Sequence, residues 1–245
     1  MNCKPLGGPA YGSIGHLPSS RLGSGDHCVP QGQADICTVK CRHGDTVFVE
    51  EKLDGSCCAV WRDSNGKLHA LTRAGYEAST SRYEQHWLFA AWVLENEAKF
   101  GWLPCGWRIV GEWIAQAHGT LYHDVDLPFI PFIPFDVFDD QGVRLSRRSF
   151  ANLLDASHLW RAKCVHVGHA LDIETGMRFV RDCIHGPHTD KPEGLVYRVE
   201  HNGQFDFLAK WVRPDKVDGC YLPEVSGCPA VWNWGPKKER VCQTT

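Results

Sequence analysis

The chain has 245 residues, 43% of them hydrophobic, which is enough to bury a substantial core as one large domain or as one domain with a small appendage. Its formal net charge of -3 excludes a global basic footprint, so any nucleic-acid contact must use a local patch. No apolar run approaches the roughly 20 residues of a membrane span, and we expect no membrane contact. The 12 cysteines are scattered and no signal peptide precedes them, which indicates reduced thiols in a cytoplasmic protein.

The N-terminal segment, residues 1–45, is rich in glycine, proline and serine and has no sustained periodicity, which predicts an irregular arm packed on the following domain. Two groups of cysteine and histidine can be drawn as zinc sites: Cys28, Cys37, Cys41 and His43, and Cys183, His185 and His188. The first group departs from the usual zinc spacing, and the histidines of the second lie beside glycine and proline, as is common in solvated turns. Neither group is typical of a zinc site.

Three short strands are predicted over residues 47–53, 57–62 and 67–73, forming an antiparallel meander. Asp54-Gly55 joins the first pair, with a glycine that can take a positive φ. Asp63-Ser64-Asn65-Gly66, a strong hairpin signal, joins the second pair.

The first of these strands ends in a lysine, Lys52, directly before the turn at Asp54-Gly55. Alternation places Lys52 on the same face as Phe48 and Glu50. A lysine attacks phosphorus only as the neutral amine, so its pKa must be lowered by burial or nearby cations and its position must be held rigidly. The stretch predicts a lysine that is modified covalently by a nucleotide; a solvated lysine on a surface hairpin is the alternative.

The next element is a predicted helix from Ser81 to about residue 99, because Ser81-x-x-Glu84 is a capping box. One stripe of this helix carries Trp87, Leu88, Ala91, Leu94 and Ala98. We interpret these side chains as core.

A strand is then predicted over residues 107–115, with Glu112 on the same face as Val110 and Ile114. A buried carboxylate is costly unless it is paired. Glu112 therefore either binds a ligand or metal, or completes a structural ion pair.

Further along, Pro128, Pro131 and Pro134 exclude a central strand at the start of the next apolar run. A strand is predicted after that start, over residues 133–138. The remaining predicted elements are helices over 149–159 and 172–184 and strands over 192–199 and 205–213. In the last strand Lys210 and Val212 share one face, whereas Arg213 points away.

Beyond Lys52, four groups follow in order: Arg73, Gly111-Glu112, Phe135-Asp136, and Glu193-Gly194 with Lys210 after it. In this order and approximate spacing the chain resembles the ATP-dependent RNA ligases, members of the covalent nucleotidyltransferase superfamily with DNA ligases and mRNA capping enzymes. The resemblance spans roughly residues 15–215. It implies an α+β fold, a nucleotidyltransferase (ATP-grasp-like) domain of antiparallel sheets flanked by helices, over residues 46–215.

The resemblance also implies residue roles. It assigns catalysis to Lys52 and Lys210, nucleotide binding to Glu50, Glu51, Arg73, Glu112, Phe135, Glu193, Lys210 and Arg213, metal binding to Glu193, and contact with an RNA phosphate to Arg21. Glu50 or Glu51 would read the adenine amino group, Phe135 would stack on the base, and Lys210 would contact the α-phosphate. Arg213 stands near the place where relatives carry a second lysine, here Val212.

The implied reaction uses ATP and Mg²⁺ or Mn²⁺: Lys52 takes AMP, passes it to an RNA 5′-phosphate, and a 3′-hydroxyl seals the strand. The implied partner is RNA with 5′-phosphate and 3′-hydroxyl ends, with an accessory protein as a possible further partner. Only 35 residues follow Lys210 (245 minus 210), so we expect residues 216–245 to form a short extension without an OB domain.

Two features bear on the choice among relatives. Ser56-Cys57 after the turn is closer to RNA ligases than to DNA ligases or capping enzymes, although a cysteine replaces the asparagine of those RNA ligases. The alternatives are a minimal DNA ligase or guanylyltransferase, and a non-catalytic module that binds nucleotide or RNA without turnover.

Overall fold

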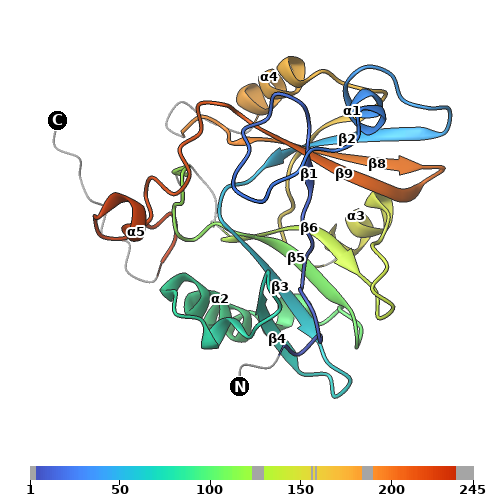
Figure 1. The fold of residues 1–245 in the computed structure, drawn as a ribbon. Coiled ribbons are helices and arrows are strands. Elements are labelled where there is room, and N and C mark those ends of the chain that lie inside the picture. Colours follow the sequence, from blue (N-terminus) through green and yellow to red (C-terminus); the bar gives the residue numbers. More distant parts are fainter. Residues whose placement is uncertain (1–3, 123–129, 156, 158, 184–189, 236–245) are drawn as a thin grey trace.

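The computed structural model describes residues 4–122, 130–155, 157, 159–183 and 190–235. They form a mixed α+β fold of two sheets flanked by helices, as predicted (Figure 1). The five-stranded sheet has the order β1 (Gly15–His16), β9 (Gln204–Val212), β8 (Gly194–His201), β2 (Asp45–Lys52), β7 (Cys164–Gly168). The four-stranded sheet has the order β4 (Leu68–Thr72), β3 (Ser56–Arg62), β5 (Arg108–Trp113), β6 (Phe132–Phe138).

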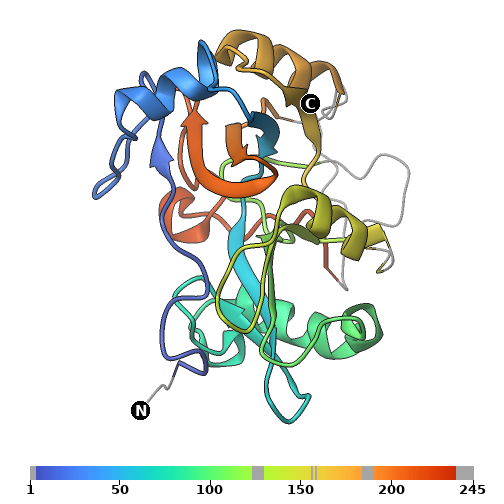
Figure 2. The same cartoon turned by 90° about the vertical axis from the view of Figure 1, so that its right-hand side faces the viewer.

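The helices lie on the outer sides of these sheets. They are α1 (Gln31–Thr38), α2 (Glu84–Glu95), α3 (Arg147–Asp155), α4 (Ile173–Cys183) and α5 (Pro223–Ser226), with short 3-10 segments at η1 (Ala78–Thr80) and η2 (Glu97–Phe100). Figure 2 shows α1 and α4 at one end of the molecule and α2 at the other. Each sheet therefore has a core of its own. One core packs α1 and α4 on the five-stranded sheet, and the other packs α2 on the four-stranded sheet.

The predicted three-stranded meander is wrong at its first turn. β2 pairs with β7 and β8, whereas β3 pairs with β4 and β5, so only the β3–β4 hairpin forms as expected. The turn at Asp54-Gly55 instead carries the chain from one sheet to the other. Gly55 does not have a positive φ; a Cβ there would lie 2.5 Å from the Trp113 carbonyl oxygen, so close approach of β5 is what requires glycine.

Helix α2 differs from its prediction in start and in buried face. It begins at Glu84 after Tyr83, and no side chain caps it, because the Ser81 hydroxyl contacts His86 Nδ1 at 2.7 Å instead. The buried residues are Gln85, Phe89, Trp92 and Val93. Phe89 and Trp92 pack on Trp113 and Phe132 of the sheet. The predicted core stripe is therefore wrong, since Trp87 is 51% and Leu94 71% exposed.

The N-terminal segment contains regular structure that its composition did not predict. β1 adds to the edge of the five-stranded sheet as a parallel partner of β9, and α1 buries Ala34 and Cys37. Cys37 belongs to the hydrophobic core and Cys41 Sγ contacts His169 Nδ1 at 3.4 Å, so the first cysteine group does not assemble. Within the described residues no group of three or more His, Cys, Asp or Glu is placed to hold a metal ion.

The second cysteine and histidine group lies outside what the structure describes, since His185, His188 and the Cys183 side chain fall there. Pro128 also lies outside the described residues. Pro134 lies within β6, which is an edge strand bonded only to β5, where a missing N–H is tolerated. Among the described helices, none is both long and apolar enough to cross a membrane.

Candidate active site

Residues from both sheets line a cavity of about 890 Å³. Among the expected site residues, those on its wall are Glu50, Glu51, Lys52, Arg73, Glu112, Phe135 and Lys210. Glu193 contacts Lys52 from behind the wall. Arg21 and Arg213 are not lining residues. Sites for small ligands occupy about 300–1,000 Å³, so the cavity is large enough for a nucleotide.

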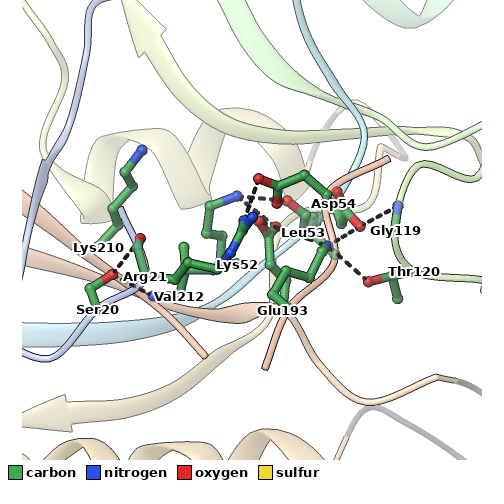
Figure 3. Close-up of polar contacts among 12 residues, drawn as sticks. Ser20, Arg21, Lys52, Leu53, Asp54, Gly119, Thr120, Glu193, Lys210 and Val212 are labelled. Atoms are coloured by element: carbon green, nitrogen blue, oxygen red, sulfur yellow. Dashed lines mark hydrogen bonds and ion pairs between the residues drawn. The ribbon is translucent and has the colours of Figure 1, made fainter. Parts of the chain in front are cut away.

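Lys52 is the last residue of β2 and lies opposite Gly194, the first residue of β8. Its Nζ is 2.6 Å from Glu193 Oε2, and its side chain is 23% exposed (Figure 3). Burial alone would lower the pKa of Lys52, but the carboxylates of Glu193 and then Glu112 outweigh burial and raise it. Without nucleotide Lys52 is therefore an ammonium ion, opposite to the lowered pKa that its role as a nucleophile led us to expect.

Glu112 lies on β5 and adds a second carboxyl group beside Lys52. Burial raises its pKa to about 8, an effect that Lys52 opposes and Glu193 reinforces. Burial also raises the pKa of Glu193, and Lys52 opposes this. Two carboxyl groups beside one lysine are hard oxygen ligands, and Mg²⁺ needs only one or two such groups in addition to phosphate oxygens. Glu112 and Glu193 therefore fit a divalent cation.

A second buried lysine, Lys216, completes the cluster and was not predicted. Its Nζ forms an ion pair with Asp54 and lies 3.9 Å from Glu193 Oε1. Asp54 also accepts a hydrogen bond of 2.8 Å from the Gly119 N–H (Figure 3). Lys216 follows β9 in a segment without strand alternation, beyond the domain boundary that we placed at residue 215. The only signal for Lys216 in the sequence is a charged residue next to Asp215, and such a pair is typical of a surface turn.

Glu50 belongs to a different ionic group at the side of the cavity. Its carboxylate is 2.6 Å from Arg147, and burial raises its pKa while Arg147 and then Arg198 oppose this. Arg198 in turn contacts Asp136 at 2.8 Å and Glu200 at 2.9 Å. Glu50 is 5% exposed, so it is not a solvated strand glutamate.

Asp136, which follows Phe135, has further partners. The Tyr11 hydroxyl donates to it at 2.6 Å, and Arg144 Nε is 3.1 Å away. Phe135 packs edge-on against Tyr11, with ring centroids 5.2 Å apart, and also faces the cavity. The Phe135-Asp136 pair thus joins a cavity wall to a buried ion-pair network.

The three remaining expected residues on the cavity wall are one glutamate, Glu51, and two cations, Arg73 and Lys210. Glu51 is 3% exposed, so it too is not a solvated glutamate. Arg73 directly follows β4, and its guanidinium donates a hydrogen bond of 3.1 Å to the Gly12 carbonyl oxygen. Lys210 Nζ is 3.7 Å from Asp26, and its pKa is lowered by burial and by Lys52. In Figure 3, Lys52 lies between Lys210 and Glu193.

The structure does not bring the two other expected arginines to the cavity. Arg213 contacts Asp215 at 2.9 Å, and its backbone N–H donates to the Glu193 carbonyl at 3.0 Å. Arg21 pairs with Asp218. Arg213, which directly follows β9, therefore supports Glu193 through the main chain, while its side chain pairs with Asp215.

Residues 45–212 match the family model of RNA ligase, and this range is more than half of the chain. The chain belongs to the RNA ligase family. Its structural neighbours include an archaeal and a Naegleria gruberi RNA ligase. No curated protein matches this RNA ligase family member in sequence.

Solved structures show the same fold at low sequence identity. An archaeal ATP-dependent RNA ligase is 20% identical, with a TM-score of 0.53 over 82% of this chain. A Naegleria gruberi RNA ligase mutant with ATP and Mn is 16% identical, with a TM-score of 0.51 over 83% of this chain. This family member spans only 48% and 61% of the length of those two proteins, respectively.

Proposed function

We propose that the chain is an ATP-dependent RNA ligase that forms a covalent lysyl-AMP intermediate at Lys52. The observation that carries the proposal is a half-buried lysine at a strand end, which lines a nucleotide-sized cavity and is ion-paired with Glu193. Family membership supports ligase chemistry, and the ATP and Mn of the Naegleria protein support ATP and Mg²⁺ or Mn²⁺ here.

In the first step the Lys52 amine attacks the α-phosphorus of ATP. The new bond joins Nζ to phosphorus, the bond from phosphorus to the bridging oxygen breaks, and pyrophosphate leaves. Because Lys52 is an ammonium ion beforehand, its proton must first move to a base. Glu193 Oε2, at 2.6 Å, is the acceptor that the geometry offers. A divalent cation held by Glu193 and Glu112 would neutralise charge on the triphosphate when bound.

The other cavity residues have roles that follow from their positions. Lys210 would neutralise charge on the α-phosphate from the side of Lys52 that is opposite to Glu193. Phe135 would stack on the base, and Arg73 would contact the ribose or the departing phosphates. Glu50 or Glu51, which both line the cavity, would recognise the adenine amino group.

Later steps complete the ligation. AMP passes from Lys52 to the 5′-phosphate of an RNA strand, and a 3′-hydroxyl attacks that phosphate with AMP as the leaving group. We place the protein in the cytoplasm, since the described cysteines whose state is defined are all free thiols. An accessory protein that contributes to RNA binding stays part of the proposal.

The test is ATP-dependent joining of a labelled RNA that carries a 5′-phosphate and a 3′-hydroxyl. Wild type is expected to join it, Lys52→Arg to be inactive, and Lys67→Arg, an exposed hairpin lysine, to match wild type. Replacing ATP with GTP, or RNA with DNA, distinguishes a guanylyltransferase and a DNA ligase. Joining by Lys52→Arg, or ATP binding by wild type without any joining, would contradict the proposal.

A further inference from the structure

The cavity extends beyond the residues that surround Lys52 to a wall formed by the segment between β4 and the first turn of α2. We call this the aromatic wall: Tyr76, Thr80, Ser81, Arg82, Tyr83 and His86. Tyr76 is 37% exposed and Tyr83 is 38% exposed. Both rings therefore have surface available at the mouth of a cavity whose other end holds the proposed nucleophile.

Each exposed ring is accompanied by a cation. The Arg82 guanidinium is 4.8 Å from the Tyr83 ring centroid and donates to the Tyr83 hydroxyl at 2.6 Å. Lys4 Nζ lies 4.8 Å from the Tyr76 ring centroid. Aromatic rings that stack bases, next to cations that neutralise phosphates, are the arrangement by which proteins hold single-stranded nucleic acid.

The wall is held in place by buried contacts. His86 Nε2 is 3.0 Å from Ser56 Oγ, and its other ring nitrogen contacts Ser81. The Tyr83 ring packs on His86 with centroids 5.7 Å apart. Ser56 lies four residues after Lys52, so one chain of contacts links the nucleophile's own turn to the Tyr83 ring. A ring fixed in this way loses little conformational entropy when a base stacks on it.

Charge at the wall also favours a polyanion. The carboxylate of Glu77, which lines the cavity beside Tyr76, is bound by His69 Nδ1 at 2.5 Å. Arg73 adds another positive charge to the same cavity. At the wall itself the cations Lys4, Arg73 and Arg82 outnumber the single carboxylate of Glu77, and this is the local positive charge that a nucleic-acid contact needs in a protein with a net charge of -3.

We propose that the aromatic wall binds the unpaired terminal nucleotides of a single-stranded RNA, with bases on Tyr76 and Tyr83 and phosphates beside Arg82 and Arg73. This rests on the proposed function and specifies its substrate. Bases in a duplex are stacked on each other and do not offer their faces, whereas unpaired ends do. The preferred substrate is thus a pair of single-stranded ends and not a nick in a duplex.

The test measures binding of a fluorescent, 5′-phosphorylated single-stranded RNA by anisotropy, with a nicked duplex of the same sequence as the second ligand. Tyr76→Ala and Tyr83→Ala are each expected to weaken single-strand binding on the order of tenfold and to leave the weaker duplex binding unchanged. Tyr83→Phe retains the ring and should retain affinity. Trp160→Ala removes an aromatic side chain that is 44% exposed and lies outside the cavity, and it is the matched control.

Two results would overturn the inference. One is a Tyr76→Ala, Tyr83→Ala double variant that binds single-stranded RNA as wild type does. The other is an equal loss for both ligands, which would indicate a surface that attracts phosphates without stacking bases. Adenylation of wild-type Lys52 is measured separately. If no adenylate forms, the proposed function is wrong, but the binding result still decides whether the aromatic wall binds single-stranded RNA.

Discussion

Two ionic groups lie beside the cavity and differ in their cations and in the number of carboxyl groups for each cation. The lysine cluster consists of Lys52, Asp54, Glu112, Glu193 and Lys216. The arginine network consists of Glu50, Asp136, Arg144, Arg147, Arg198 and Glu200. The network has three carboxyl groups and three guanidinium groups, whereas the cluster has three carboxyl groups, of which Glu112 has a raised pKa, and two ammonium groups.

This difference separates a structural ionic group from a chemical one. Guanidinium groups stay protonated at all relevant pH values and bind carboxylates through a planar fork, so the arginine network fixes one geometry. Ammonium groups can lose a proton, and burial, reinforced by Glu193 and opposed by Lys52, raises the pKa of Glu112 to about 8. The cluster is therefore able to exchange protons and accept a cation, while the network joins β6, β8 and α3 around it.

Breaking the arginine network should have the largest effect on stability. Arg198→Met leaves Asp136 and Glu200 buried without their shared cation, which should lower the free energy of unfolding by about 3–5 kcal/mol. Chemical denaturation measures this. Arg148→Met, an exposed position on α3, is the control and should change it by less than about 1 kcal/mol. Equal losses in the two variants would show that the network is not structural.

Lys216 should affect chemistry as well as stability. Lys216→Met leaves Asp54 and Glu193 with Lys52 as their only cluster cation, which raises the pKa of Lys52 further and displaces the turn. Adenylation should slow roughly tenfold to a hundredfold, with its rate profile shifted to higher pH. Lys191→Met removes an ammonium group that is 77% exposed, and it should leave the profile unchanged. A slower rate with an unshifted profile would assign Lys216 a purely structural role.

The contrast between Lys52 and Lys216 also shows how far the sequence can predict the site. The signal for Lys52 is local, because a strand, a lysine and a turn follow one another within a few residues. Lys216 reaches Asp54 from 162 positions away, and no local pattern marks it. Local patterns also failed at two other places. The turn after β2 resembles a hairpin but joins two sheets, and the buried face of α2 is set by its contacts with Trp113 and Phe132.

Glu112 gives the lysine cluster a pH dependence that the network lacks. Its pKa of about 8 lies above its ordinary value of 4.5, so the folded protein holds a proton that the unfolded chain releases. The resulting stabilisation is complete below about pH 4.5 and is lost as the pH rises through about 8. Relative to wild type, Glu112→Gln should therefore gain about 1.4 kcal/mol of unfolding free energy for each pH unit between these limits. Thermal unfolding at several pH values tests this, and a difference independent of pH would contradict it.

The smallest effect is expected at Arg21, which belongs to neither group. Its ion pair with Asp218 is largely solvated, so Arg21→Ala should change the free energy of unfolding by no more than about 0.5 kcal/mol. If Arg21 contacts an RNA phosphate, as the resemblance implied, the variant should bind RNA more weakly at low salt and equally at high salt. Equal affinity at all salt concentrations would remove Arg21 from the RNA-binding surface.

The most direct test of the account is peptide mapping by mass spectrometry after incubation with ATP and Mg²⁺ at several pH values. The account predicts an adenylate on the peptide that contains Lys52, formed faster as the pH rises because the ammonium group must lose its proton. It also predicts no such adduct in Lys52→Arg and a normal adduct in Lys67→Arg. An adenylate on another residue, or none on Lys52 under any of these conditions, would contradict the account.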